Sequence, residues 1–425
     1  MNVGFVSLGC SKNLVDTEMM IGLFKSKKHK IVNNPEDADI IVVNTCGFIG
    51  PSKEEAINTL LEMAEYKKTG KLKYIIATGC LIERYKEQLQ KVMPEIDLFI
   101  KFSEYDKLWE QIDLLLDKKH EEAELSFNNR VITTGDNYAY VRIAEGCDNF
   151  CTFCAIPYIR GRFRSRTEES IIEEVEILAK KGIKEIIIVA QDTTKYGVDI
   201  YGKPRLAEIL HKISQVKGVE WVRFLYSYPE TITDELIEEV KNNKKICKYF
   251  DIPIQHISNK ILKKMNRDTT SESIKALIER LRKEIPDVII RTTLMVGFPG
   301  EEKEDFDELY EFVKTAKFDK LGCFSYSKEE GTPANLMQNQ VHHMTKKSRL
   351  NKIMKLQAEI SNENLQKHIG KTYKVIVETQ NTARSYMDVP ELDGVILFKG
   401  KAQPGSFAKC KITGNKDYDL IGEII

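Results

Sequence analysis

The sequence predicts an α/β protein with three parts: an N-terminal parallel α/β domain, a central series of six β/α units, and a small C-terminal antiparallel β-barrel. Short β-rich runs alternate with helical stretches up to about residue 130, and a more regular alternation begins near residue 137. Beyond about residue 370 the pattern changes to short strands separated by Gly, Asn and Pro turns. We therefore expect domains at 1–130, 135–365 and 366–425.

The composition is that of an ordinary soluble protein, with 42% hydrophobic and 30% charged residues. Lys plus Arg and Asp plus Glu both number 64, so no global charge attracts the chain to nucleic acid or membrane. No charged leader or bilayer-length apolar run is visible. Nine cysteines without an export signal favour a reducing compartment, which we expect to be the cytoplasm, and metal or redox chemistry over disulfides.

The N-terminal domain carries one cysteine directly after each predicted strand. These strands are Val3–Leu8, Ile40–Asn44 and Tyr74–Thr78, and the cysteines are Cys10, Cys46 and Cys80. Loops at the carboxyl ends of parallel strands converge on one edge of the sheet, where ligands bind. We expect the three thiols to meet there. The alternative is that they are small buried hydrophobic residues, which is common for free cysteine.

A charged, turn-rich stretch from Lys118 to Arg130 predicts a linker, and the six β/α units follow it. Their strands are predicted at Tyr140–Glu145, Glu185–Gln191, Trp221–Tyr226, Tyr249–Ile254, Val288–Val296 and Leu321–Tyr326. A long helix from Met344 to about His368 should precede the terminal barrel. The strands of that barrel are predicted at Tyr373–Glu378, Gly394–Phe398, Phe407–Ile412 and Asp419–Ile424, an OB-like size.

The loop after the first central strand contains Cys147, Cys151 and Cys154. Each thiolate can bind one iron of a [4Fe–4S] cube, which leaves the fourth iron open to bind and activate a small molecule. In barrels of this kind the chemistry lies on loops after the strands, as here. One alternative is zinc, but a structural zinc site takes four protein ligands, and no further Cys or His lies nearby in sequence. The other is three unconnected buried cysteines.

The Cys-x3-Cys-x2-Cys spacing, with Phe153 just before the last cysteine, resembles the radical S-adenosylmethionine (SAM) enzymes. In that family the open iron chelates SAM, and the reduced cluster cleaves it to methionine and a 5′-deoxyadenosyl radical. Further motifs narrow the resemblance to the methylthiotransferases: Ala144-Glu145-Gly146-Cys147, Ala155-Ile156-Pro157, Arg160-Gly161, Ser165-Arg166, Gly9-Cys10-x-Lys12-Asn13-x-x-Asp16, Asn44-Thr45-Cys46 and Gly79-Cys80. Ser11 departs from the proline that is frequent in this family, and we expect no functional consequence.

This resemblance implies a central partial (β/α)6 radical SAM barrel and a terminal TRAM domain. It also implies two [4Fe–4S] clusters: a radical SAM cluster on Cys147, Cys151 and Cys154, and an auxiliary cluster on the N-terminal triad. One SAM would methylate a sulfur held at the auxiliary cluster, and a second would supply the radical. An electron donor such as flavodoxin or ferredoxin is expected.

Polar and glycine residues at strand ends are the next candidates. Those expected to contact SAM or substrate are Gln191, Ser227, Gln255, Arg291, Gly297 and Gly300. The glycines of the Gly297–Glu301 turn permit close backbone approach to a ligand, and the turn resembles one that contacts SAM in the family. For the polar side chains, capping and loop hydrogen bonding are equally good readings. Arg291 could equally be an exposed strand residue.

Four arginines, Arg160, Arg162, Arg164 and Arg166, recur at every second residue after the cysteine loop. In an extended segment they would lie on one side. They could bind phosphates or an acidic protein, or balance the charge of a cluster. A solvated basic edge is the alternative.

The substrate distinguishes two branches of the family, one acting on a tRNA adenosine and one on the β-carbon of an aspartate in small-subunit ribosomal protein number twelve. The stretch Ala383–Gly394 resembles the terminal-domain signature of the protein branch, and Tyr138–Tyr140 and Phe250–Pro253 also fit it. We therefore predict methylthiolation of the ribosomal protein. The alternatives are tRNA adenosine modification, or a non-catalytic iron–sulfur or zinc protein with a nucleic-acid-binding barrel.

The charge of the terminal domain supports a protein substrate. Residues 366–425 contain eight Lys and one Arg against three Glu and four Asp, a net charge of +2, without the basic stripe typical of phosphate binding. Asp388, Glu391 and Asp393 are expected to form an acidic loop that attracts a basic ribosomal protein.

Overall fold

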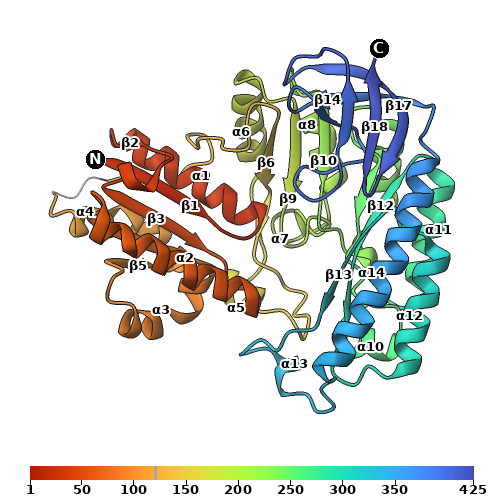
Figure 1. Ribbon diagram of the computed structural model, residues 1–425, viewed down its shortest axis with the longest axis horizontal. Coiled ribbons are helices and arrows are strands. Elements are labelled where there is room, and N and C mark those ends of the chain that lie inside the picture. The colour runs from red at the N-terminus through yellow and green to blue at the C-terminus, as the bar shows by residue number, and fades with distance from the viewer. Residues whose placement is uncertain (119–121) are drawn as a thin grey trace. The chain divides into compact units, whose positions relative to one another are not determined.

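The computed structural model describes residues 1–118 and 122–425, which form two compact units (Figure 1). Unit 1 comprises residues 1–133, 140–164 and 327–335, and unit 2 comprises 134–139, 165–326 and 336–425. The predicted linker includes residues 119–121, which lie outside the described residues. In the described part of the chain, no helix combines the length and the apolar character that crossing a membrane requires.

Unit 1 contains a five-stranded, fully parallel sheet in the order β2-β1-β3-β4-β5. The strands are β1 (Asn2–Ser7), β2 (Lys30–Ile31), β3 (Ile40–Thr45), β4 (Tyr74–Gly79) and β5 (Leu98–Ile100). The predicted parallel domain is confirmed. The two outer strands were not predicted, because runs of two or three residues are too short to show a period.

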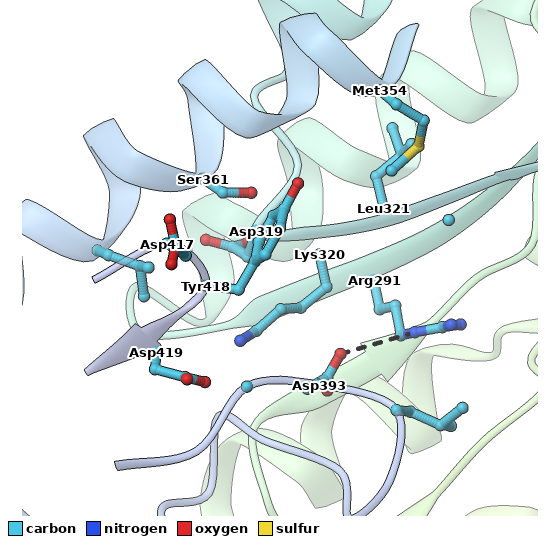
Figure 2. A pocket seen from close by; sticks show the side chains of 14 residues that line it. Arg291, Asp319, Lys320, Leu321, Met354, Ser361, Asp393, Asp417, Tyr418 and Asp419 are labelled. Carbon is cyan, nitrogen blue, oxygen red and sulfur yellow. Dashed lines mark ion pairs between the residues drawn. The ribbon is translucent and has the colours of Figure 1, made fainter. Parts of the chain in front are cut away.

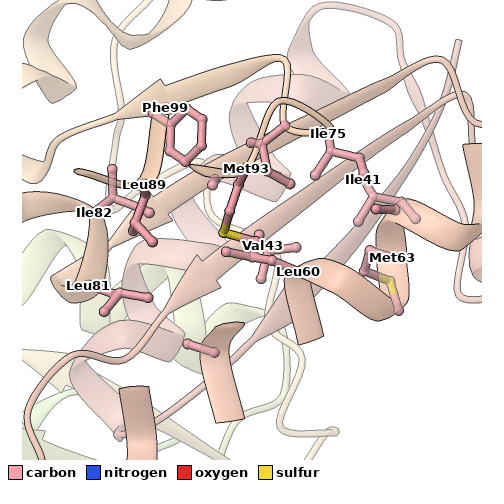
Figure 3. Packing of buried hydrophobic residues seen from close by; sticks show 14 of the residues in the cluster. Ile41, Val43, Leu60, Met63, Ile75, Leu81, Ile82, Leu89, Met93 and Phe99 are labelled. Carbon is pink, nitrogen blue, oxygen red and sulfur yellow. The ribbon is translucent and has the colours of Figure 1, made fainter. Parts of the chain in front are cut away.

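Helices cover both faces of this sheet. They are α1 (Ser11–Ser26) and α4 (Leu108–Leu115) on one face, and α2 (Gly50–Thr69) and α3 (Cys80–Val92) on the other. Figure 3 shows Val43, Leu60 and Phe99 among the buried side chains of the second face. Each such side chain contributes roughly 1.5–3 kcal/mol by leaving water. The result is a three-layer domain whose loops emerge at the strand ends.

A segment distant in sequence, residues 327–335, also belongs to unit 1. Its anchor is Glu329, whose side chain is 2% exposed. The carboxylate accepts hydrogen bonds from Gly50 N at 2.9 Å, Lys53 Nζ at 2.8 Å and Arg84 Nη1 at 3.3 Å. These charges on α2 and α3 balance the buried carboxylate and hold the segment in place.

Unit 2 contains the central parallel strands. They are β9 (Glu185–Val189) paired with β10 (Trp221–Phe224), and β11 (Tyr249–Asp251), β12 (Ile289–Val296) and β13 (Lys320–Ser325) in that order. After β10, the backbone N–H of Ser227 donates a hydrogen bond of 2.9 Å to the carbonyl oxygen of Asp251. This bond links the end of β10 to β11. The first predicted strand corresponds to β6 (Tyr138–Arg142), where the chain passes between the units, and β7 (Ala144–Glu145). All six predicted central strands are present.

Helices alternate with these strands. They are α6 (Glu168–Lys180), α7 (Val198–Tyr201), α8 (Leu206–Gln215), α9 (Asp234–Asn242), α10 (Asn259–Lys264), α11 (Ser271–Glu284), α12 (Lys303–Ala316) and α14 (His343–Gln366). Shorter elements are α5 (Ile156–Arg160), α13 (Pro333–Leu336), β8 (Arg164–Ser165), and the 3₁₀ turns η1 (Pro35–Asp37), η2 (Phe102–Lys107) and η3 (Pro229–Thr231).

The C-terminal segment forms a closed barrel in the order β14-β15-β16-β18-β17. Its strands are β14 (Thr372–Val377), β15 (Thr382–Arg384), β16 (Ile396–Lys399), β17 (Phe407–Lys416) and β18 (Asp419–Ile424). The predicted small barrel is confirmed. One detail differs: β16 and β18 pair in parallel, whereas the other neighbours in the barrel are antiparallel.

A buried charge network joins this barrel to the central strands within unit 2. Glu185, at the start of β9, accepts hydrogen bonds from Arg384 Nη2 at 2.7 Å and Arg223 Nε at 2.9 Å. All three side chains are at most 1% exposed. Burial would raise the pKa of Glu185, but the charges of Arg384 and Arg223 outweigh this effect and lower it.

We expect Arg384→Met to lower the free energy of unfolding by about 3–5 kcal/mol, because it removes one partner of a buried carboxylate. Arg280→Met is the matched control. The Arg280 side chain is 41% exposed and pairs with Asp234 and Glu284, so its loss should cost at most about 1 kcal/mol. Denaturant unfolding measures both. Equal effects of the two substitutions would contradict the importance of the buried network.

Candidate functional site

The three N-terminal cysteines lie at the carboxyl edge of the unit 1 sheet. Cys10 follows β1, Cys46 follows β3, and Cys80 begins α3 directly after β4. In a doubly wound sheet of this strand order, the chain direction across the sheet reverses between β1 and β3, and ligands bind in the crevice outside that point. Cys10 and Cys46 flank the reversal, and Cys80 lies after the next strand.

The three loops approach one another too closely for larger residues. Gly9 has φ +89°, and a Cβ placed on it would lie 2.8 Å from the Cβ of Cys46. A Cβ on Gly47 would lie 2.6 Å from the Cα of Leu81, the residue after Cys80. The three thiols also affect one another electrostatically. Burial raises the pKa of Cys80 to about 11, Arg160 opposes this rise, and Cys10 and Cys46 add to it.

Asn13, on the first turns of α1, connects the three loops. Its Nδ2 donates to Leu8 O at 2.9 Å and to Thr45 O at 3.0 Å, the residue just before Cys46. Its Oδ1 lies 3.8 Å from the Sγ of Cys80 and accepts a hydrogen bond from Arg160 at 2.6 Å. One buried amide therefore holds together the three loops that carry the thiols.

The second triad lies on the loop before α5, also in unit 1. Cys147 and Cys151 are buried and Cys154 is half-buried. The loop turns back on itself, because Cys147 N donates to Gly161 O at 3.2 Å and Cys154 N to Cys151 O at 2.9 Å. Cys80 of the first triad packs against Ala155 and Ile159, which follow this loop, so the two cysteine regions are neighbours within one unit.

Both triads have the donor chemistry of an iron–sulfur site. All nine cysteines are free thiols. In the described part of the chain, no three His, Cys, Asp or Glu side chains are close enough together to hold one metal ion. A structural zinc site takes four protein ligands, whereas each triad offers three thiols. A [4Fe–4S] cluster binds each thiolate at a different iron, so three thiols can hold one cluster and leave one iron open.

In unit 2, four of the predicted residues follow parallel strands. Gln191 follows β9, Ser227 follows β10, Gln255 follows β11 and Gly297 follows β12, so all four lie at carboxyl ends. The hydroxyl of Ser227 is buried and has no hydrogen-bond partner among the described residues. Buried polar atoms of this kind call for a partner. Gln255 adopts φ +68°, and its backbone is held by Thr293 and Met295.

The glycine turn after β12 is packed by side chains of its own unit. Gly297 N and Phe298 N donate to the carboxylate of Glu301 at 2.5 and 3.1 Å. A Cβ on Gly297 (φ +73°) would lie 2.3 Å from Cγ of Lys346, and one on Gly300 (φ +79°) 2.1 Å from Nζ of Lys264. Gly297 is therefore required for local packing, whereas at Gly300 the flexible end of Lys264 can move and only the positive φ favours glycine.

Arg291 lies near the amino end of β12, away from the carboxyl ends that carry the other candidates. Its guanidinium pairs with Asp251 at 2.9 Å and with Asp393 at 3.8 Å. It lines a cavity of about 450 Å³ together with Lys320 and Tyr418 (Figure 2). Its described partners are carboxylates of the same unit.

The predicted acidic loop of the terminal domain is a wrong expectation. Asp388 is buried and pairs with Lys320 at 2.9 Å. The side chain of Asp393 is only 3% exposed and accepts a hydrogen bond from Tyr249 at 2.7 Å. Only Glu391 of the three is exposed. Two of the acids therefore hold the terminal domain to the central strands and do not form a surface for a basic partner.

The alternating arginines do not form one basic edge either. Arg160 ends α5 and is 3% exposed, whereas the side chain of Arg162 is 72% exposed. Arg166 pairs with the buried Glu174 at 2.5 Å. The helix and the turn at Gly161 (φ +75°) break the extended geometry on which the prediction depended.

The sequence motif after Cys10 contains Asn13 and Asp16, but it does not indicate what these two residues contact. Asp16 is buried and accepts hydrogen bonds from Arg142 at 2.5 Å and Arg160 at 2.8 Å. Their spacing of three residues, just after Cys10, places both on one face of α1. That spacing was the available signal.

Comparison with known proteins shows that three families match the chain. Residues 2–101 match uncharacterized protein family UPF0004, residues 141–313 the radical SAM superfamily, and residues 369–425 the TRAM domain. The chain is 58% identical to the ribosomal protein uS12 methylthiotransferase RimO of Alkaliphilus oremlandii, covering 100% of this chain and 99% of the relative. It is 52% identical to the protein of that name from Clostridium botulinum strain Hall, covering 99% and 98%.

Two solved structures share the fold. One is the radical SAM methyltransferase TsrM of Kitasatospora setae with cobalamin and a [4Fe-4S] cluster bound, at TM-score 0.59 and 12% identity, covering 79% of this chain and 77% of that one. The other is the cobalamin-dependent SAM radical enzyme OxsB, at TM-score 0.55 and 17% identity, covering 83% and 56%. These likenesses confirm the central radical SAM fold.

We expect Gly9→Ala to destabilise the protein by about 2–5 kcal/mol, because it adds left-handed backbone strain and a contact of 2.8 Å with Cys46. Gly135→Ala is the control. Gly135 has φ +83° but nothing within 4 Å of its added Cβ, so strain alone should cost about 1–2 kcal/mol. Thermal unfolding compares them. If Gly9→Ala is no worse than Gly135→Ala, the tight approach of the cysteine loops is not a constraint.

Proposed function

Because the chain belongs to the RimO-type family of ribosomal protein uS12 methylthiotransferases, we propose that it binds two [4Fe–4S] clusters. Cys147, Cys151 and Cys154 would hold the cluster that binds SAM. Cys10, Cys46 and Cys80 would hold the auxiliary cluster, at the edge of the unit 1 sheet. Membership of the radical SAM superfamily gives SAM and iron–sulfur chemistry, and the second cluster is part of this proposal.

The reaction is transfer of a methylthio group to ribosomal protein uS12, at an aspartate β-carbon. Cys147, Cys151 and Cys154 would hold a cluster that supplies radical chemistry from SAM, and Cys10, Cys46 and Cys80 would hold one that supplies sulfur. Both triads belong to one compact unit, which supports a site in which hydrogen abstraction and sulfur delivery would act on the same carbon.

The observation that carries the proposal is the packing of Cys80 against Ala155 and Ile159. It brings a thiol of the N-terminal triad beside the helix that follows the radical SAM loop. A protein with one working cluster would not need a second cysteine triad there.

Five residues are proposed for SAM: Gln191, Ser227, Gln255, Gly297 and Gly300. Four follow parallel strands, and the unsatisfied hydroxyl of Ser227 supports a ligand there. Arg291 is already paired with Asp251 and Asp393, and we propose that it holds the terminal domain.

The remaining features follow from the proposed substrate. A ribosomal protein substrate is consistent with a cytoplasmic enzyme, and a flavodoxin or ferredoxin would supply electrons. The domain division at 1–130, 135–365 and 366–425 stays a prediction.

The two triads can be tested separately. Anaerobically reconstituted protein should contain roughly eight irons per chain, four in each cube. Replacing Cys147, Cys151 and Cys154 by Ala should halve the iron content and abolish SAM cleavage. Replacing Cys10, Cys46 and Cys80 by Ala should also halve the iron content but leave 5′-deoxyadenosine formation detectable. Full iron in either triple variant would refute the assignment, and stoichiometric zinc in anaerobically purified protein would favour the non-catalytic alternative.

Mass spectrometry tests the substrate. A strain lacking this enzyme should lose the methylthio mass increment from one aspartate of ribosomal protein uS12 and keep its methylthiolated tRNA adenosine. Complementation with the wild-type chain should restore the increment, and the triple variant of Cys10, Cys46 and Cys80 serves as the inactive control. Loss of the tRNA modification with an unchanged ribosomal protein would assign the enzyme to the tRNA branch.

A further inference from the structure

Arg160 is a buried cation of unit 1 that contacts Cys80, a cysteine of the N-terminal triad. It ends α5, the helix after the radical SAM loop, and its Nη2 lies 3.4 Å from Sγ of Cys80. The same nitrogen donates to Asn13 Oδ1 at 2.6 Å. The guanidinium also stacks on the ring of Phe102, 4.2 Å from its centroid. The planar fork of arginine permits these contacts at once, and a lysine ammonium would not reproduce them.

The other terminal nitrogen of the guanidinium, Nη1, anchors the Arg160 side chain. Nη1 of Arg160 donates to Asp16 at 2.8 Å and lies 3.4 Å from Glu145, two residues before Cys147. Arg142 pairs with the same two carboxylates, at 2.5 and 2.8 Å. Two arginines therefore face two carboxylates, and the set is neutral. The anchored fork holds its second nitrogen toward Cys80.

A hydrogen-bond donor that contacts a cysteine sulfur changes the reduction potential of a cluster that this sulfur ligates. As a ligand, Cys80 carries negative charge, and a guanidinium N–H to it is a charge-assisted hydrogen bond. Burial strengthens such a bond because the local dielectric is low. Hydrogen bonds to cluster sulfurs help set the reduction potential. Stabilising negative charge favours the reduced state and raises the potential.

We propose that Arg160 is a positioning residue for the auxiliary cluster: it orients Cys80 and raises the reduction potential of that cluster. This inference rests on the proposed function, since it requires a cluster on Cys10, Cys46 and Cys80. Although Arg160 follows the loop of the second triad, it would act on the cluster of the N-terminal triad. The link through Asp16 and Glu145 also fixes the auxiliary site to the loop that carries Cys147.

The experiment uses full-length chain in which Cys147, Cys151 and Cys154 are replaced by Ala, so that only the auxiliary cluster remains. Arg160→Gln and Arg160→Lys are introduced into this background. Anaerobic redox titration with dithionite, followed by electron paramagnetic resonance, gives the midpoint potential. Arg160→Gln should make one-electron reduction at least about tenfold less favourable, a shift of about 59 mV to more negative potential. Arg160→Lys, which keeps the charge and loses the fork, should shift it less.

Arg84→Lys is the matched control. Arg84 lies on α3, as Cys80 does, and its hydrogen bonds go to oxygens: Gly47 O at 2.8 Å, Glu330 O at 2.7 Å and Glu329 at 3.3 Å. Its substitution should leave the potential unchanged even if it lowers the melting temperature. A purely structural role of Arg160 would give the same pattern, with stability lowered and the potential constant, and would overturn the proposal.

The failure of the proposed function has a different signature. A background protein with Arg160 intact that binds no iron would remove the auxiliary cluster itself, and this role with it. If Arg160→Gln fails to fold, Arg160→Lys decides alone. An iron-loaded Arg160→Lys variant that keeps the midpoint potential and the resonance spectrum of the background protein would contradict the role.

Discussion

Close approach of three backbone loops is the constraint on which unit 1 depends. The loops after β1, β3 and β4 come so near that Gly9 and Gly47 leave no room for a Cβ. Backbone carbonyls at such an edge would be costly if unpaired, and the amide of Asn13 satisfies Leu8 O and Thr45 O together. The hydrophobic layers of the sheet provide stability, but this amide determines where the thiols lie.

The sequence was sufficient to predict the three strands that precede Cys10, Cys46 and Cys80, and the position of these cysteines at one sheet edge. This was possible because parallel strands place their following loops on the same side, whatever the packing around them. The role of Asn13 could not be predicted in the same way. Its partner Thr45 lies 32 residues away and its partner Arg160 lies 147 away, and no local pattern encodes such pairs.

Charge patterns were less reliable than strand patterns for the same reason. Asp388 and Asp393 were predicted to be solvent-exposed, yet Lys320, 68 residues before Asp388, and Arg291 on β12 pair with them. Counting charges along a segment gives its net charge but not the partners that other segments bring. The four alternating arginines show this as well, since Arg160 is buried and Arg162 is exposed.

The compact units do not follow the order of the chain, and this has a consequence for the chemistry. By sequence, the loop of Cys147, Cys151 and Cys154 belongs with the central strands, but it packs in unit 1, as does the segment held by Glu329. Both cysteine triads therefore lie in one compact unit, where Arg160 of α5 pairs with Asp16 of α1. Under the proposed function, support by one compact unit would fix the separation of the two clusters, which a reaction that requires both at one carbon demands.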